Sequence, residues 1–250
     1  MIMIKIKKFF ANFFNLISRF IYYIIPRELR SRWNYREISI DSLIKENSTK
    51  ECYEHFKEIF KTTVLFRETV RETEKIRKYA IENAISNDEQ KELFYLEFGV
   101  WRGKSTNFFS KYVKKLYAFD SFEGLREDWL GNYGMKKGHF NLNKQIPKLN
   151  SNIEPIVGFV QDTLDDFLKK HNPKINFVHL DMDTYPSTKY ALERLKPYLN
   201  KDAIIIFDEL YNYPGWENGE YKALKEVFKD DEYIFKAFNV SGVEVVIQIK

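Results

Sequence analysis

Five short apolar runs recur along the chain, and each ends in a polar or acidic cluster. The runs cover residues 94–98, 115–120, 155–159, 175–180 and 203–207. Most are separated by segments with helical spacing of apolar residues, at 163–170, 187–199 and 221–229. Alternating strands and helices predict βαβ units and a mostly parallel sheet, with the ligand crevice outside the carboxyl ends of the strands.

The first run leads into a loop framed by Gly99 and Gly103, after which helical spacing begins. Glycines let the backbone approach a ligand, and a new helix presents unpaired N–H groups to an anion. The GxxxG spacing differs from the GxGxxG of dinucleotide folds, which disfavours nicotinamide chemistry. A plain structural turn is the alternative. Asp120 follows about twenty residues later, where nucleotide folds place a ribose-binding carboxylate.

Acidic residues follow the last two runs, with Asp181 and Asp183 after one and Asp208 and Glu209 after the other. We expect the two strands to be neighbours, so these carboxylates can converge. Hard divalent cations prefer such oxygen ligands. In an extended strand Asp183 shares a face with Asp181, which makes it an alternative ligand or a general base.

Five segments, in register over about residues 90–230, carry a family resemblance. They are EFGVWRG at 97–103, FDSFEGL at 119–125, QDTL at 161–164, HLDMDTYPST at 179–188 and FDELYNYPGW at 207–216. The chain resembles class I S-adenosylmethionine-dependent methyltransferases, within them the macrocin O-methyltransferase-like group, relatives of metal-dependent catechol-type enzymes. The resemblance implies an α/β fold: a doubly wound, mostly parallel seven-stranded sheet of Rossmann-like methyltransferase type, whose last strand is antiparallel.

The resemblance also implies how the cofactor is held. Glu97 and the backbone of residues 99–103 would bind its amino-acid end, and Asp120 both ribose hydroxyls. Residues 160–162 would frame the adenine, with helix capping as the alternative role for the last two. The full predicted cofactor set is Glu97, Gly99, Trp101, Gly103, Ser105, Asp120, Ser121, Val160, Gln161 and Asp162.

By the same resemblance, Asp181, Asp208 and Glu209 would bind a divalent metal, most simply Mg²⁺. The metal would bind the acceptor hydroxyl and lower its pKa. The relatives carry Asp or Asn where Glu209 stands, and a lysine where Thr184 stands, so a lysine-base mechanism does not carry over. The predicted catalytic residues are Asp181, Asp183 and His139.

Two further segments bear on the acceptor. His139 lies in the glycine- and lysine-rich stretch 131–148, which we interpret as a lid. Tyr211, Tyr213 and Trp216 follow the acidic pair, and aromatic faces suit a sugar or aryl acceptor. Trp216 plugging the edge of the sheet is the alternative. His179, inside an apolar run, is interpreted as a hydrogen-bonded core residue.

Residues 1–27 contain no acid and predict an amphipathic helix with a basic polar stripe, ended by Pro26. Its longest uncharged run is too short to span a bilayer, and no small-residue cleavage site follows. Docking on a membrane surface and packing against protein, including a homodimer partner, remain open. Residues 28–93 predict a helical cap region with one helix over 66–87, and residues 94–250 the catalytic domain.

Composition adds three limits. A chain of 250 residues can bury one good core. The single cysteine, Cys52, excludes an internal disulfide and suits a cytoplasmic location, at the inner face of the membrane if residues 1–27 dock there. Neither zinc spacing nor an aromatic-interleaved basic stripe is present in the catalytic region, so nucleic acid is not an expected partner.

The function that follows is S-adenosylmethionine-dependent methyl transfer to a hydroxyl of a small-molecule or glycan acceptor. The resemblance implies a sugar of a surface polysaccharide or a glycosylated metabolite. The alternatives are a catechol-like phenolic acceptor and a non-catalytic cofactor-binding scaffold anchored by the N-terminus.

Overall fold

The computed structural model describes residues 13–14, 16–26, 39–69, 73–86, 88, 92–129 and 134–250. The chain divides into two units, residues 1–44 and residues 45–250. In the first unit, residues 13–14 and 16–24 are helical, and α3 (Ile40–Phe56) begins within it. The described part of the predicted amphipathic segment is therefore helical, whereas its first 12 residues lie outside the described residues.

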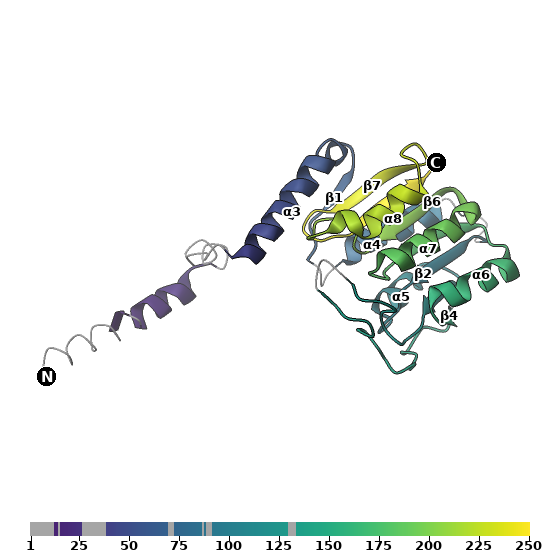
Figure 1. The fold of residues 1–250 in the computed structure, drawn as a ribbon, viewed down its shortest axis with the longest axis horizontal. Helices are drawn as coiled ribbons and strands as arrows, with labels where there is room; N and C mark the ends of the chain where they lie inside the picture. Colours follow the sequence, from purple (N-terminus) through teal and green to yellow (C-terminus); the bar gives the residue numbers. More distant parts are fainter. Residues whose placement is uncertain are drawn as a thin grey trace, which may run out of the picture. The chain divides into compact units, whose positions relative to one another are not determined.

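The larger unit is built on an eight-stranded sheet in the order β1-β7-β8-β6-β5-β2-β3-β4 (Figure 1). The strands are β1 (Val64–Phe66), β2 (Phe94–Phe98), β3 (Leu116–Asp120), β4 (Ile153–Val157), β5 (Ile175–Leu180), β6 (Leu199–Phe207), β7 (Tyr233–Asn239) and β8 (Val245–Ile249). β8 runs antiparallel to both of its neighbours, β6 and β7, and every other pairing is parallel. The predicted doubly wound sheet with an inserted last strand is thus confirmed.

Helices cover both faces of this sheet. They are α4 (Glu74–Ser86), α5 (Lys104–Phe109), α6 (Val160–His171), α7 (Tyr185–Leu195) and α8 (Glu220–Val227), with 3₁₀ turns η1 (Ile59–Lys61), η2 (Lys196–Tyr198) and η3 (Trp216–Asn218). One hydrophobic cluster joins α6, α7 and α8 to the near face in Figure 1, together with Phe56 of α3. A second cluster joins α4 and α5 to the other face. Successive strand residues alternate between the clusters, since Leu96 belongs to the first and Tyr95 to the second.

The region before β2 differs from its prediction. Val64–Phe66 form β1, an eighth strand paired with β7, within residues 28–93, which were expected to be a helical cap region. The helix α4 begins only at Glu74, and the carboxylate of Glu68 fixes its start by accepting the N–H groups of Lys75 and Ile76, at 2.8 Å each. Two unpaired donors of the first helical turn are thereby satisfied, which anchors α4 beside the sheet.

Candidate active site

The strands β2, β3, β5 and β6 end at a common cavity of about 590 Å³. Its wall is made largely by the segments that follow these strands and β4, together with part of α4 and the lid. The main lining stretches are residues 99–102, 119–121, 124–126, 158–161, 181–184 and 208–209. The predicted crevice outside the carboxyl ends of the strands is therefore present.

The glycine-framed loop forms one wall of the cavity. Gly99 has a φ of +91°, and a Cβ placed on it would lie 1.7 Å from the carbonyl oxygen of Asp181. The loops after β2 and β5 hence approach each other too closely for any side chain at this position. Trp101 and Ser105 also line the cavity. Gly103, with a φ of +75°, is the N-cap of α5 and does not line it.

Asp120 ties this loop to the next strand. One carboxylate oxygen accepts the N–H groups of Val100 and Trp101, and the other accepts that of Phe122, each at 2.7 Å. An ionised carboxylate offers about four acceptor sites, so capacity for a ligand hydroxyl remains. Asp120 and Ser121 both line the cavity. The acid expected to bind ribose therefore also shapes the loop that would hold the rest of the cofactor.

The wall predicted to frame adenine contains Val160 and Gln161 but not Asp162. Gln161 accepts a hydrogen bond from the Arg126 guanidinium at 3.0 Å and donates one to the Ser187 hydroxyl at 3.3 Å. Asp162 lies 3.5 Å from Arg126, outside the lining. The N-cap of α6 is Phe159 and has no side-chain cap, so the alternative capping role is not found for either residue.

Three carboxylates converge on the opposite wall. Asp181, Asp183 and Glu209 each place one oxygen within 4.8 Å of the others, and the buried Oε2 of Glu209 has no hydrogen-bond partner. Asp183 adopts a left-handed backbone with a φ of +63°, so it reaches this group from a turn and not from the extended strand that was expected. Burial raises the pKa of Asp183 to about 7, assisted by the charges of Asp208 and Asp120.

Burial and the neighbouring carboxylates also raise the pKa values of Asp181 and Glu209 well above their usual range. Three carboxyl groups that repel one another, with an orphaned buried oxygen among them, fit a divalent cation with oxygen ligands. The group brought together contains two of the predicted ligands, Asp181 and Glu209, together with Asp183, whereas the predicted ligand Asp208 falls in a second group with His179 and Asp181.

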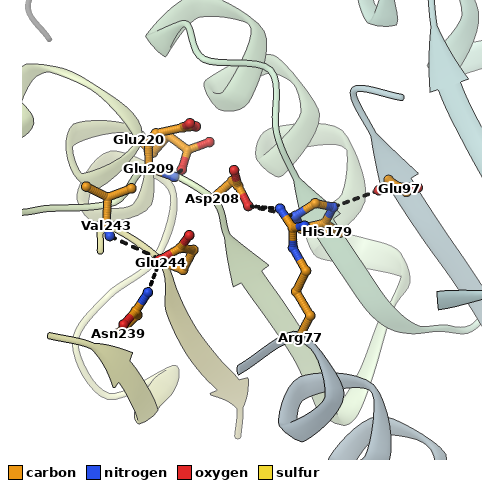
Figure 2. Close-up of polar contacts among 9 residues, drawn as sticks. All are labelled: Arg77, Glu97, His179, Asp208, Glu209, Glu220, Asn239, Val243 and Glu244. Carbon is orange, nitrogen blue, oxygen red and sulfur yellow. Dashed lines mark hydrogen bonds and ion pairs between the residues drawn. The ribbon is translucent and has the colours of Figure 1, made fainter. Parts of the chain in front are cut away.

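Asp208 lies within a chain of four buried or nearly buried groups that runs from Arg77 through Asp208 and His179 to Glu97 (Figure 2). It accepts hydrogen bonds from Arg77 at 2.7 Å and from His179 Nε2 at 3.3 Å. The other ring nitrogen of His179 donates to Glu97 at 2.9 Å. Burial opposes ionisation of Asp208, but the Arg77 charge and the His179 hydrogen bond outweigh it and hold the pKa of Asp208 below its usual range.

Burial likewise opposes protonation of His179, yet its hydrogen bonds to Asp208 and Glu97 raise its pKa to about 9. The grouping of His179, Asp181 and Asp208 is also close enough for a metal, but both ring nitrogens of His179 are already hydrogen-bonded to carboxylates. His179 is a hydrogen-bonded core residue, as predicted. Glu97 is fully buried, bonds His179 through Oε1 and does not line the cavity, and its contact with the amino-acid end of a cofactor stays a prediction.

Arg77 was missed by the sequence analysis. It comes from α4 and lies 131 residues before Asp208 in the chain. The available signal was its position on the inward face of the predicted helix, in line with the buried Ala80, Ile81 and Ala84. A cation on such a face needs a buried anion, but the partner could not be read from local pattern.

The three aromatic residues expected to contact the acceptor require a correction. Tyr211, Tyr213 and Trp216 are at most 3% exposed and none lines the cavity. They pack against Phe56 of α3 and the near-face cluster, because the segment after Glu209 turns into the core before α8 begins. The alternative for Trp216, a structural plug, agrees with this position.

The predicted lid covers the cavity with other side chains. Among the described residues of this stretch, Met135 and Phe140 line the cavity, as does Trp129 just before it. The N–H of Leu125 donates to the carbonyl of His139 at 2.9 Å, which ties the lid to the segment after β3. The His139 side chain is exposed and does not line the cavity, so the lid supplies apolar surface and not the predicted base.

A mostly parallel sheet with one antiparallel inserted strand, and a cavity across its strand ends, defines the Rossmann-like methyltransferase fold. Residues 96–210 match a methyltransferase domain family.

A curated relative is 8-demethyl-8-(2,3-dimethoxy-alpha-L-rhamnosyl)-tetracenomycin-C 4'-O-methyltransferase from Streptomyces olivaceus, which is 25% identical over 155 residues. The match covers 53% of this chain and spans 58% of the relative's length.

Two solved structures share the fold. The calicheamicin methyltransferase CalS11 superposes with a TM-score of 0.57 at 20% identity, over 68% of this chain and 77% of that one. Another structure of CalS11 describes it as a TDP-rhamnose 3'-O-methyltransferase. The O-methyltransferase NovP superposes with a TM-score of 0.53 at 18% identity, over 71% of this chain and 79% of that one.

Proposed function

We propose that the protein transfers a methyl group from S-adenosylmethionine to a hydroxyl of a sugar, assisted by a divalent metal ion. The observation that carries the proposal is one cavity with two unlike walls. A glycine loop fixed by Asp120 forms one wall, and the carboxylates of Asp181, Asp183 and Glu209 form the other. This arrangement suits a methyl donor facing a hydroxyl that must lose its proton.

The cofactor supplies an electrophilic methyl group on a sulfonium, and the metal ion lowers the pKa of a hydroxyl that it binds. The loop after Gly99, the carboxylate of Asp120 and the amide of Gln161 would hold the cofactor. The trio of Asp181, Asp183 and Glu209 would hold the ion. Asp183, whose pKa burial raises to about 7, would also be able to accept the proton of the acceptor hydroxyl.

A sugar acceptor is supported by the described activities of the tetracenomycin relative and of CalS11. It is also supported by the aromatic rings of Trp101, Trp129 and Phe140, which line the cavity where the predicted trio of aromatics does not. Ring faces beside polar groups such as Arg126 and Ser187 suit the alternating apolar and hydroxyl surfaces of a pyranose. The acceptor would belong to a surface polysaccharide or a glycosylated metabolite.

Calorimetry with S-adenosylmethionine, followed by transfer of a labelled methyl group to a panel of nucleotide-activated sugars, glycosides and catechols, tests the proposal. We expect cofactor binding at a 1:1 ratio, turnover on a sugar, loss of turnover in chelator and recovery with Mg²⁺. Asp181→Asn should reduce turnover at least about tenfold and leave cofactor affinity within about twofold, because it removes a metal ligand.

The matched control is Asp166→Asn, which removes an exposed carboxylate of α6 outside the cavity lining and should change neither quantity. Absence of cofactor binding would overturn the whole proposal. Full turnover in excess chelator would remove only the metal from it, and turnover restricted to catechols would replace the sugar by a phenolic acceptor.

A further inference from the structure

The helical segment in residues 13–24 exposes apolar side chains that the methyl-transfer site does not use. Six of them are between 37% and 73% exposed: Phe14, Leu16, Ile17, Phe20, Ile21 and Ile24. At 100° per residue these six positions fall within an arc of about 160°. Ser18, Arg19 and Tyr22 fall on the remaining side. The segment therefore has one wide apolar face and one polar face.

The charge of this region is one-sided. Residues 1–27 carry five basic side chains, Lys5, Lys7, Lys8, Arg19 and Arg27, and no acidic one. The whole chain has a net charge of +4, so the remainder is close to neutral. The apolar face suits the acyl boundary of a lipid bilayer. The charged side chains of this region are all basic, which suits anionic headgroups.

The length of the segment decides how it can meet a bilayer. The described helical run of residues 16–24 spans about 14 Å, well short of the roughly 30 Å of a hydrocarbon core. None of the described helices is long and apolar enough to cross a membrane. Pro26 follows directly, and a proline breaks the continuation of a helix. A short amphipathic segment of this kind suits a position in the plane of the membrane interface.

The core of the larger unit is complete without this segment. Both hydrophobic clusters of that unit are built from described residues at Cys52 and beyond. The segment itself belongs to the unit of residues 1–44. Its apolar residues are thus not required to fill the core around the candidate active site.

We propose that the helical segment within residues 13–24 docks the protein on an anionic lipid bilayer surface, with its apolar face in the acyl boundary and the basic side chains of Arg19 and of the flanking Lys5, Lys7, Lys8 and Arg27 among the headgroups. Tyr23, near its end, suits the headgroup level, where amphipathic rings accumulate. This inference is independent of the proposed methyl transfer, since it uses no residue of the cavity.

The test is co-sedimentation of the full chain with vesicles of phosphatidylcholine alone or with 30% phosphatidylglycerol. We expect binding to the anionic vesicles at 50 mM salt and at least about tenfold weaker binding at 500 mM, because salt screens the basic side chains. Two full-chain double variants separate insertion from electrostatics. Ile17→Glu with Phe20→Glu places two charges on the apolar face, whereas Ser18→Glu with Tyr22→Glu places the same two charges on the polar face.

Both variants lower the net charge equally, so they lose the same electrostatic attraction. The first should bind at least about tenfold more weakly than the second, because only it buries charge in the acyl boundary. Light scattering and cofactor calorimetry on each variant check that assembly and the active-site fold are kept. Failure of the full chain to bind anionic vesicles at low salt overturns the proposal, as does equal binding by the two variants. An oligomer that dissociates only in the first variant also overturns it, in favour of self-association.

Discussion

At the scale of single residues, the most consequential feature is that Asp208 is already neutralised. Arg77 and His179 both donate to its carboxylate, and the side chains of Arg77 and Asp208 are only 12% and 15% exposed. Asp208 stays ionised in this arrangement, and its charge helps to raise the pKa values of Asp181, Asp183 and Glu209 beside it. In the proposed function, this trio of carboxyl groups binds the cation.

Replacing Arg77 by methionine tests this arrangement. Arg77→Met leaves Asp208 nearly buried with one partner fewer, and breaking such a pair costs about 3 kcal/mol of unfolding free energy. The double variant Arg77→Met with Asp208→Asn removes both charges and should be more stable than the sum of the two single losses implies. Denaturant unfolding of the four proteins in a double-mutant cycle measures the coupling. Strictly additive losses would show that the two groups do not support each other.

At the scale of elements, the loop after β2 is fixed by backbone contact more than by side chains. The closeness of Gly99 to the Asp181 carbonyl joins the cofactor wall directly to the acidic wall. The segment interpreted as a lid forms a third side of the cavity. Backbone hydrogen bonds between Leu125 and residues 138–139 tie it to the segment after β3.

Gly99→Ala should therefore abolish cofactor binding and destabilise the fold. Gly138→Ala is its matched control, because Gly138 has a similar φ of +81° but would place its Cβ where nothing lies within 4 Å. The control should lose about 1 kcal/mol from the left-handed backbone alone and keep cofactor affinity. Thermal unfolding and calorimetry on both variants compare them. Equal effects at the two positions would mean that the close approach to Asp181 carries no cost.

The periodicity of apolar residues correctly predicted the elements whose pattern lies within one short stretch of sequence. Apolar runs such as residues 175–180 and 203–207 end at Leu180 and Phe207 as expected, and their acidic followers converge. The position of Tyr211, Tyr213 and Trp216 was not predictable, because an aromatic residue after a strand suits a cavity and a core equally. Neither was β1, whose three residues form a strand only because β7 offers its edge.

At the scale of the whole molecule, the fold follows largely from local sequence patterns, whereas the site does not. Strand order follows from alternation and the handedness of βαβ crossovers, which act on every such chain alike. The site depends on contacts between residues far apart in sequence, such as Arg77 with Asp208 or Thr188 of α7 with Glu220 of α8. These contacts also concentrate buried acids in one part of the larger unit, with Glu209, Glu220 and Glu244 around Asp208 (Figure 2).

These buried acids determine how the free energy of unfolding of the whole protein depends on pH. Burial raises the pKa of Glu220 to about 8, and neighbouring charges add to it, although the N–H of Glu209 donates to its carboxylate. An acid with a raised pKa in the folded state binds more protons there than in the unfolded chain. Stability therefore falls as pH rises from about 4.5 to 8. His179, with a pKa raised to about 9, acts in the same direction between about 6.5 and 9.

We accordingly expect the metal-free protein, kept in chelator, to lose thermal stability steadily from pH 5 to pH 9. Glu220→Gln should flatten this decline, because the amide is an isostere of the protonated acid and can still accept the N–H of Glu209. At pH 8 the variant should exceed the wild type by on the order of 2 kcal/mol, and the difference should nearly vanish at pH 5. Calorimetric unfolding across this range measures both, with Glu217→Gln, which changes an exposed glutamate just before α8, as the control. A wild-type stability that rises between pH 5 and pH 8 would contradict the expectation, since it would require Glu220 to be more readily ionised in the fold than in the unfolded chain.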